Sequence, residues 1–180
     1  MTPAINSSDI ALRFRSGADW FTQSELDGLF TCIIGANSER AVDLMHSLAQ
    51  LFPELFSVSI SALRERQSWW DNACARSDVR DVLARLKVLL AGYGGVEFAM
   101  YTAEDQITLT PELQLVIYSR SGKWRELLRD MGLDELAQAP PPVWCVSRDS
   151  LVPAPELSDS LMLAVRRLAL APGDFDVAQT

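Results

Sequence analysis

Histidine and cysteine are scarce in this chain. Its 180 residues include one histidine, His46, and three cysteines, Cys32, Cys74 and Cys145. A single imidazole excludes a zinc site built from several histidines and any mechanism that needs two of them. Three cysteines spread far apart are typical of reduced thiols, whereas a disulfide framework has an even, denser set. We therefore expect no metal or other cofactor, and a reducing compartment.

Positive charge and long apolar runs are also lacking. Lysine and arginine total 16 against 24 acidic residues, which gives a net charge of −8 and a pI of about 4.6. Such a chain repels phosphate backbones, so nucleic acid is not expected as a partner. The acidic balance suits either a basic partner protein or simple solubility. No apolar run approaches the roughly 20 residues that span a bilayer, and no signal peptide is visible, so we expect no membrane insertion and a cytoplasmic location.

Internal repeats, low-complexity segments and charge runs are absent as well. Apolar residues make up 48% of the chain and charged residues 22%, which are ordinary values for a globular protein. We predict a single α+β domain over residues 1–180. Its N-terminal part, about 22–91, is expected to be helical and its C-terminal part, about 95–170, rich in sheet. Residues 1–8 and 173–180 are expected to be tails.

Residues 77–90 have the clearest pattern in the sequence. Their apolar residues recur with helical spacing on one face. These residues are Val79, Val82, Leu83, Leu86, Leu89 and Leu90. Ser77 is a suitable N-cap, and Gly92 can adopt the left-handed conformation that ends a helix. The glycines at 92, 94 and 95 superficially resemble a phosphate loop, but they follow a helix instead of preceding one, so we interpret them as a helix end.

Five further segments have helical patterns. They are residues 22–34, 38–52, 61–73, 121–131 and 155–168. The first contains Gly28, which lowers helix stability by about 1 kcal/mol. The second begins at a capping residue, Asn37 or Ser38, and ends at Pro53. Together with residues 77–90, these segments predict five or six helices.

Alternating patterns, or a short apolar run at residues 143–147, predict strands in three places. Residues 96–119 contain three such runs joined by short turns, which indicates an antiparallel meander. Thr110 and Pro111 could instead begin a helix, but the β-branched residues that follow favour a strand. Residues 143–147 predict a fourth strand, and residues 10–14 a short strand or a helical start. The expected fold is therefore an antiparallel sheet of about four strands packed against the helices.

The adjacent tryptophans Trp69 and Trp70 are the most suggestive feature for function. On a helix, neighbouring side chains point about 100° apart, so both rings cannot lie at the centre of one buried face. An exposed tryptophan near charged residues such as Arg66 has the composition of a binding hot spot. The plainer interpretation is one ring in the core and one lying on the surface. We also consider Glu104 and Asp105, at a predicted hairpin tip, as candidate partner-binding residues.

The only catalytic pair that the composition allows is a thiol with the single histidine. Cys74 lies near Arg76 and could be activated by His46, with Asp43 orienting the imidazole. The plainer interpretation is a buried structural cysteine and a surface histidine bonded locally. Cys32 and Cys145 lie in apolar segments, which make a thiol inert. No catalytic residue is therefore assigned.

Three functions follow from these features. The first is a non-enzymatic, acidic protein-binding module, such as an immunity protein, a secretion chaperone or an adaptor. The alternative is a small enzyme with Cys74 as nucleophile and His46 as base. The third is a small-molecule sensor with a pocket between the meander and the helices.

Overall fold

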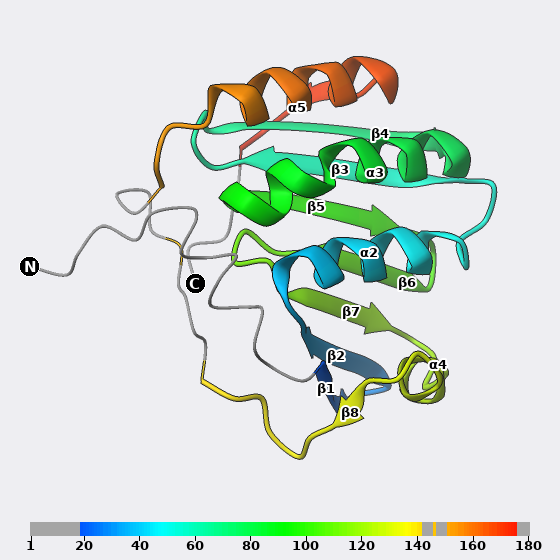
Figure 1. The fold of residues 1–180 in the computed structure, drawn as a ribbon. Helices are drawn as coiled ribbons and strands as arrows, with labels where there is room; N and C mark the ends of the chain where they lie inside the picture. Colours follow the sequence, from blue (N-terminus) through cyan, green and yellow to red (C-terminus); the bar gives the residue numbers. More distant parts are fainter. Residues whose placement is uncertain (1–18, 142–145, 147–150, 176–180) are drawn as a thin grey trace, which may run out of the picture.

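The computed structural model describes residues 19–141, 146 and 151–175 (Figure 1). In chain order the elements are β1 (Trp20–Leu26), β2 (Leu29–Gly35), α2 (Ser38–Ala49), β3 (Leu55–Ala62), β4 (Gln67–Ala75), α3 (Arg76–Tyr93), β5 (Val96–Tyr101), β6 (Asp105–Leu109), β7 (Leu115–Ser119), α4 (Trp124–Asp130), β8 (Asp134–Glu135), α5 (Pro155–Arg167) and β9 (Ala171–Gly173). The strands form one sheet in the order β8-β1-β2-β7-β6-β5-β3-β4-β9. Only β8 runs parallel to its neighbour, β1.

The predicted architecture of about four strands and five or six helices is wrong. The described residues contain nine strands and four helices. The error arises from two segments that were expected to be helical and instead form strand hairpins. The strands predicted at residues 10–14 and 143–147 lie outside the described residues, apart from Val146, as do the N-terminal tail and residues 176–180.

The first misread segment is residues 22–34, which belong to the β1–β2 hairpin. Leu26 pairs with Leu29 across a two-residue turn made by Asp27 and Gly28, whose φ angles are 52° and 77°. A two-residue turn with both φ angles positive matches the twist of the flanking strands, and the pair Asp-Gly is well suited to it. Gly28 thus makes the turn possible, whereas in a helix it would only lower the stability of the helix.

The second misread segment is residues 61–73, which belong to the β3–β4 hairpin. Every second residue of β3 is buried, the period of a strand. The helix formers between Leu63 and Arg66 make the connecting turn, where Arg66 has a φ of 55°. Pairing with β5 on one side and β4 on the other, which only the folded chain provides, decides the conformation here over local propensity.

The predicted meander is present at the centre of the sheet. Strands β5, β6 and β7 pair antiparallel, with Phe98 opposite Leu109 and Ile107 opposite Ile117. Thr110 and Pro111 lie in the turn between β6 and β7, not in a helix, and the backbone N–H of Thr110 donates to the carbonyl of Gln114. The β-branched residues of β7 therefore form the expected strand.

The helices predicted around 38–52, 77–90, 121–131 and 155–168 are confirmed as α2, α3, α4 and α5. Asn37 caps α2 by accepting a hydrogen bond from the backbone N–H of Arg40 at 2.8 Å. The N-cap position of α3 is Ala75, not Ser77, and no side chain caps that end. Beyond α3, Gly94 and Gly95 carry the positive φ angles that were expected at Gly92.

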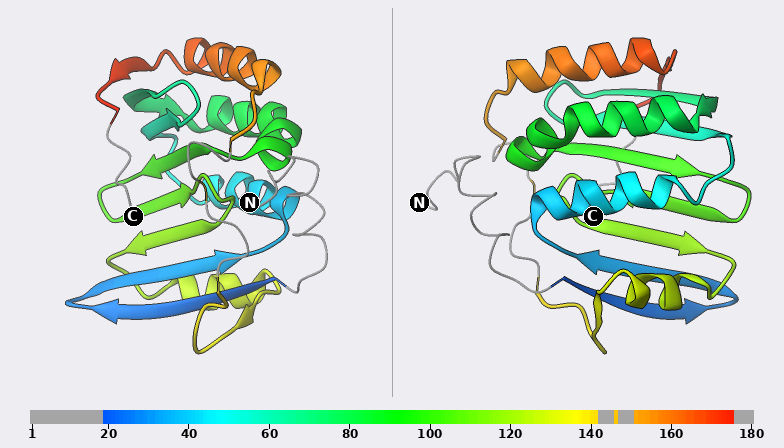
Figure 2. Two further views of the ribbon diagram at one scale, coloured as in Figure 1. Left: turned by 90° about the vertical axis from the view of Figure 1, so that its left-hand side faces the viewer. Right: turned by 45° about the vertical axis from the view of Figure 1, so that its right-hand side comes forward.

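The hydrophobic core lies between the sheet and the helices. Figure 2 shows α2, α3 and α5 against the same face of the sheet, with α3 between the other two in Figure 1. Leu83, Phe98 and Ile107, from the central helix and strands, are fully buried. The core is continuous from β1 and β2 to α5, so the described helices and strands share one hydrophobic interior.

Arg64 joins three segments that meet at one end of the sheet. Its guanidinium donates to the carbonyls of Val152, Gly94 and Tyr93 at 2.8, 2.6 and 2.9 Å. The last two carbonyls belong to the residue after α3 and to its final residue, where the helix dipole favours a positive charge. Arg64 thus links the β3–β4 turn to α3 and to the chain that enters α5.

Candidate interaction surface

The sheet carries its helices on one face only. α4 lies on the same side as α2, α3 and α5, because the indole of Trp124 in α4 bonds Asp105, which shares a strand face with Ile107. Within residues 19–141 and 151–175, no helix crosses the opposite face (Figure 2). We call this opposite face the open face. Because side chains alternate along a strand, the strand registers determine which residues belong to it.

The open face is almost free of charge. Its residues are Trp20, Thr22, Ser24 and Leu26 of β1; Leu29, Thr31, Ile33 and Gly35 of β2; Ser57, Ser59 and Ser61 of β3; Ser68 and Trp70 of β4; Glu97, Ala99 and Tyr101 of β5; Gln106 and Thr108 of β6; Val116 and Tyr118 of β7; and Ala171 and Gly173 of β9. Glu97 is the one charged residue in this set, although charged residues make up 22% of the chain. At the margin of the face, the exposed Asp134 of the edge strand β8 lies opposite Trp20 and adds a second carboxylate. Depletion of charge with retention of aromatic rings characterises the centre of protein–protein interfaces.

Polar groups on the open face are hydrogen-bonded to one another across the strands. The Ser59 hydroxyl lies 3.0 Å from the Tyr101 hydroxyl. A second hydroxyl pair joins Ser61 and Ser68 at 2.9 Å. Within β6, the amide of Gln106 donates to the Thr108 hydroxyl at 3.0 Å. Groups that are already paired lose less free energy when water is removed, so this face can be covered at low cost.

The single carboxylate of the open face lies in a poorly solvated position. Burial is the main cause that raises the pKa of Glu97 above its ordinary value, and the nearby carboxylate of Glu112 raises it further. Both effects disfavour the charged form. The one potential charge on the face is therefore easier to neutralise than an ordinary surface carboxylate.

Trp69 and Trp70 lie on opposite faces of the sheet, because they are neighbours in a strand. Trp69 points into the core and is 7% exposed, whereas Trp70 points to the open face and is 48% exposed. The helical geometry on which their prediction was based is wrong, but one ring is indeed buried and one is at the surface. Trp70 lies over Gly173 of β9, where a Cβ atom would come within 2.9 Å of the indole. Only Trp70 remains a candidate contact residue.

The other predicted partner-binding residues do not join Trp70. Arg66 is exposed in the β3–β4 turn, near the end of the sheet where Ala62 pairs with Val96. Glu104 is exposed in the β5–β6 turn, beyond the opposite end, where Ser57 pairs with Tyr101. The structure therefore separates these residues into two groups and does not bring them into one site.

Asp105, the remaining predicted contact residue, is buried on the helix side of the sheet. Its carboxylate accepts hydrogen bonds from the Ser119 hydroxyl at 2.6 Å, the Trp124 indole at 2.8 Å and the Lys123 ammonium at 2.7 Å. Burial acts to raise the pKa of Asp105, but the hydrogen bonds from Lys123, Ser119 and Trp124 outweigh it, so the pKa lies below its ordinary value. Asp105 fastens α4 to the sheet and offers nothing to a partner.

Cys74 does not have the environment of a nucleophile. Its thiol is 3% exposed, and its Sγ lies 3.8 Å from the carbonyl oxygen of Leu168, to which it donates. Burial is the main cause that raises its pKa to about 11, and Asp71 and Asp78 add to the effect. Cys32 is similarly buried, with a pKa of about 11 and its thiol directed at the Gln23 side chain. A thiolate nucleophile needs the opposite shift. Cys145 lies outside the described residues.

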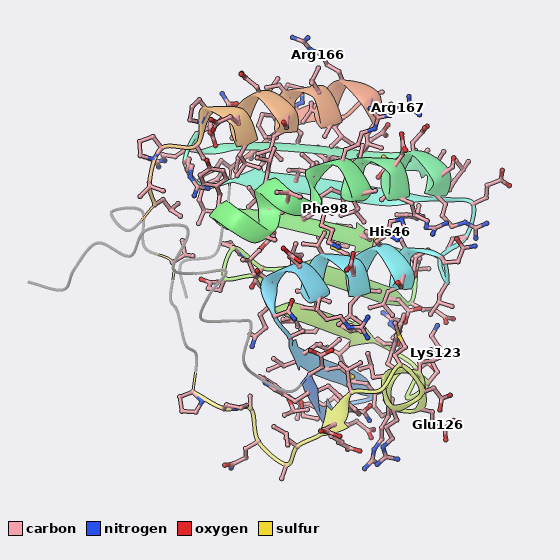
Figure 3. The ribbon with its side chains drawn as sticks, viewed as in Figure 1. His46, Phe98, Lys123, Glu126, Arg166 and Arg167 are labelled. Carbon is pink, nitrogen blue, oxygen red and sulfur yellow. The ribbon has the colours of Figure 1, made fainter. Side chains whose placement is uncertain are left out.

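His46 lies on the helix layer, on the surface of α2 that faces α3 (Figure 3). It lines an open pocket of about 480 Å³ whose wall includes Arg80 and Arg167 but not Cys74. Desolvation lowers the pKa of His46, Arg80 and Lys87 lower it further, and Asp43 opposes them. The Asp43 carboxylate accepts from Lys87 at 2.7 Å and so is not dedicated to orienting the imidazole.

The charged residues around this pocket are partly paired, although the Nε of Arg80 is buried without a hydrogen-bond partner among the described residues. Arg167 lies 2.7 Å from Asp78 and 3.7 Å from Asp81, and Arg80 donates to the Gln50 amide oxygen at 2.7 Å. Such pairs hold α2, α3 and α5 together at the surface. A second open pocket, of about 490 Å³, lies beside Arg64 and the start of α5. Neither pocket lies between the meander and the helices, where the core side chains are packed together.

The sequence did not identify the open face because its residues come from eight strands that are far apart along the chain. A local signal was nevertheless present in Leu55–Ala62. Serines at 57, 59 and 61 alternate with Phe56, Val58 and Ile60, which is the pattern of a strand with one buried face. Interpreting this segment as a strand would have placed Ser59 and Trp70 on one surface.

Comparisons with known proteins give no relative for this chain: no family model, no curated protein and no solved structure matches it. None of the helices in the described part of the chain is long and apolar enough to cross a membrane. Within the same residues, no three histidine, cysteine or acidic side chains lie close enough together to bind a metal ion.

Proposed function

We propose that this chain is a non-enzymatic protein-binding module and that the open face is its contact surface. The observation that carries the proposal is the one-sided sheet, whose open face lacks charge except at Glu97 and presents Trp70, Tyr101 and Tyr118. Depletion of charge around exposed aromatic rings is typical of the centre of protein–protein interfaces. An immunity protein, a secretion chaperone or an adaptor would act in this way.

The position of the negative charge limits where a basic partner could bind. A basic partner, which the net charge of −8 favours, would meet this acidity only around the rim of the open face, because the face itself is neutral. Rim charges speed encounter, whereas neutral, well-packed contacts at the centre supply most of the affinity. The buried thiols of Cys32 and Cys74, both free, support action in the cytoplasm.

Affinity purification with a matched pair of variants tests the proposal. The tagged wild-type chain should co-purify a stoichiometric protein from its native host, and Trp70→Ala should weaken that complex by about 30-fold or more, the effect of losing a hot-spot tryptophan. Leu163→Ala removes a large side chain that is 64% exposed on α5 and should leave the complex unchanged. Equal capture by the wild type and Trp70→Ala would rule out Trp70 as the anchor.

A second open-face variant separates the role of the face from that of one ring. Tyr118 lies on β7, four strands of the sheet away from Trp70 on β4, and its side chain is 39% exposed. The second variant is Tyr118→Ala. If the whole face is the contact surface, this variant should also weaken the complex. A complex that tolerates both variants and fails with a helix-side variant would contradict the proposal.

A further inference from the structure

Negative charge restricts how two copies of this chain can approach each other. With a net charge of −8, most orientations bring like charges together, and such repulsion opposes association. The open face is different, because its one carboxylate, Glu97, is half-buried, its other side chains are neutral, and the exposed Asp134 lies only at its margin. Two copies therefore meet with the least repulsion if their open faces meet.

The chemistry of the open face is complementary to itself. Its polar groups are mainly hydroxyls, which both donate and accept hydrogen bonds, as do serine, threonine and tyrosine in this set. In a symmetric dimer the same patch must serve both partners, so a surface of donors alone or acceptors alone could not satisfy itself. Hydroxyl pairs such as Ser59–Tyr101 and Ser61–Ser68 retain this dual capacity.

The size of the open face is adequate for a dimer. Seven strands, from β1 to β4 in the sheet order, span about 30 Å at about 4.8 Å spacing, and strands of five to nine residues extend roughly 16–30 Å. The flat area is therefore on the order of 600 Å² per copy, before the relief of the side chains is added. A stable interface of standard size buries about 800 Å² of accessible surface per partner.

We propose that the partner of the open face is a second copy of this chain, packed face to face so that two sheets form a sandwich. This inference rests on the proposed function for the contact surface, and it puts a second copy there in place of a different, basic protein. Two twisted sheets pack well when their strands lie within about 30° of one another. Strand β6 is the middle strand of the nine, so a two-fold axis over the centre of the face passes near the half-buried Gln106, beside Thr108 and Ala99, which are 6% and 0% exposed.

A charge placed near that axis tests the dimer. Light scattering at about 100 μM, where a dimer with a standard interface is saturated, should give twice the 20.0 kDa mass of the chain for the wild type. Gln106→Glu is nearly isosteric and brings two like charges together across the axis, so it should weaken dimerisation by at least about tenfold. Gln50→Glu makes the same change at the exposed residue that follows α2 and should leave the dimer intact.

Mixing two opposite variants gives a result that a folding defect cannot imitate. Gln106→Lys alone should also weaken the dimer, and an equimolar mixture of Gln106→Glu and Gln106→Lys should recover it as a heterodimer. A wild-type monomer at this concentration, or a dimer that both variants leave unchanged, would overturn the inference. The proposed function would survive the first result if Trp70→Ala still reduced capture of a different protein, so the two failures are distinguishable.

Discussion

The two faces of the sheet have opposite chemistry although they alternate residue by residue along the same strands. On β3, Phe56, Val58 and Ile60 are buried under the helices, while Ser57, Ser59 and Ser61 point to the open face. The helix side is apolar and holds one buried carboxylate, Asp105, with three hydrogen-bond donors. The open side is polar but neutral, and its one carboxylate, Glu97, has a raised pKa. The helix side stabilises the fold, whereas the open side has the features of a surface that binds another protein chain.

The adjacent tryptophans give the sharpest test of this difference. Trp69→Ala should lower the free energy of unfolding by about 3–5 kcal/mol, because it empties a large site in the core. Trp70→Ala removes the same side chain from the open face and should cost roughly 1 kcal/mol or less. Urea unfolding of both variants measures the two values. Equal losses would mean that the open face contributes to stability as much as the core does. The proposed difference between the two faces would then be wrong.

Asp105 tests whether the polar group on the helix side is structural. Asp105→Ala should lower the free energy of unfolding by about 2–4 kcal/mol, because the Ser119 hydroxyl and the Trp124 indole lose a buried acceptor. The folded-state pKa lies below the ordinary value, so this contribution is present above the unfolded pKa and is lost as pH falls through the folded pKa. Thermal melts of the wild type and Asp105→Ala from neutral to acidic pH should converge; parallel curves would contradict this role.

The hydroxyl pairs of the open face should contribute little to folding. Ser59→Ala removes a partly exposed hydrogen bond to Tyr101, and the expected loss is about 0.5–1.5 kcal/mol. Tyr101→Phe removes the same bond from the other side and serves as the matched control. A double variant that costs no more than either single variant would confirm that one bond is measured. A loss as large as that of Trp69→Ala would place this pair in a structural core.

Substitution of Glu97 should have the smallest effect on the free energy of unfolding. Its pH dependence should be opposite to that of Asp105. The folded-state pKa of Glu97 is raised, so its favourable contribution is complete below the unfolded pKa and is lost as pH rises through the folded pKa. Glu97→Gln removes the charged form and should stabilise the chain at neutral pH by roughly 0.5 kcal/mol, with no gain at acidic pH. Chemical unfolding at both pH values measures the difference. Destabilisation at neutral pH would show that the ionised carboxylate is needed.

The parts of the fold that the sequence predicts are those with one consistent local period. α3 and α2 have apolar residues on one helical face, and β5 to β7 alternate cleanly, so tertiary contacts only reinforce the local preference. The prediction was wrong for the β1–β2 hairpin because its apolar residues also fit a helical period. These residues are Leu26, Leu29, Phe30 and Ile33. The pair Asp27-Gly28 was the signal that distinguishes the two interpretations.

Other features could not be predicted because they depend on pairing between distant segments. The two-residue strand β8 exists only because Trp20 and Phe21 lie beside Asp134 and Glu135. The same holds for β9, where Pro172 lies opposite Trp69. The open face depends on all of these registers at once. No local sequence pattern specifies the order of the strands in the sheet. The residues of the open face can therefore be identified only from the structure.

The shortness of the outermost strands has a consequence for assembly. A long bare edge of a sheet is a template on which further chains can add, strand by strand, into fibres. Here β8 offers two residues and β9 three, and Pro172 in β9 has no backbone N–H to donate. These two short strands discourage growth where they lie, but β1 from Thr22 and β4 from Asp71 continue past them with no outer partner among the described residues. Stacking on the broad surface of the sheet, in contrast, ends after one partner, so only that surface limits assembly to closed complexes.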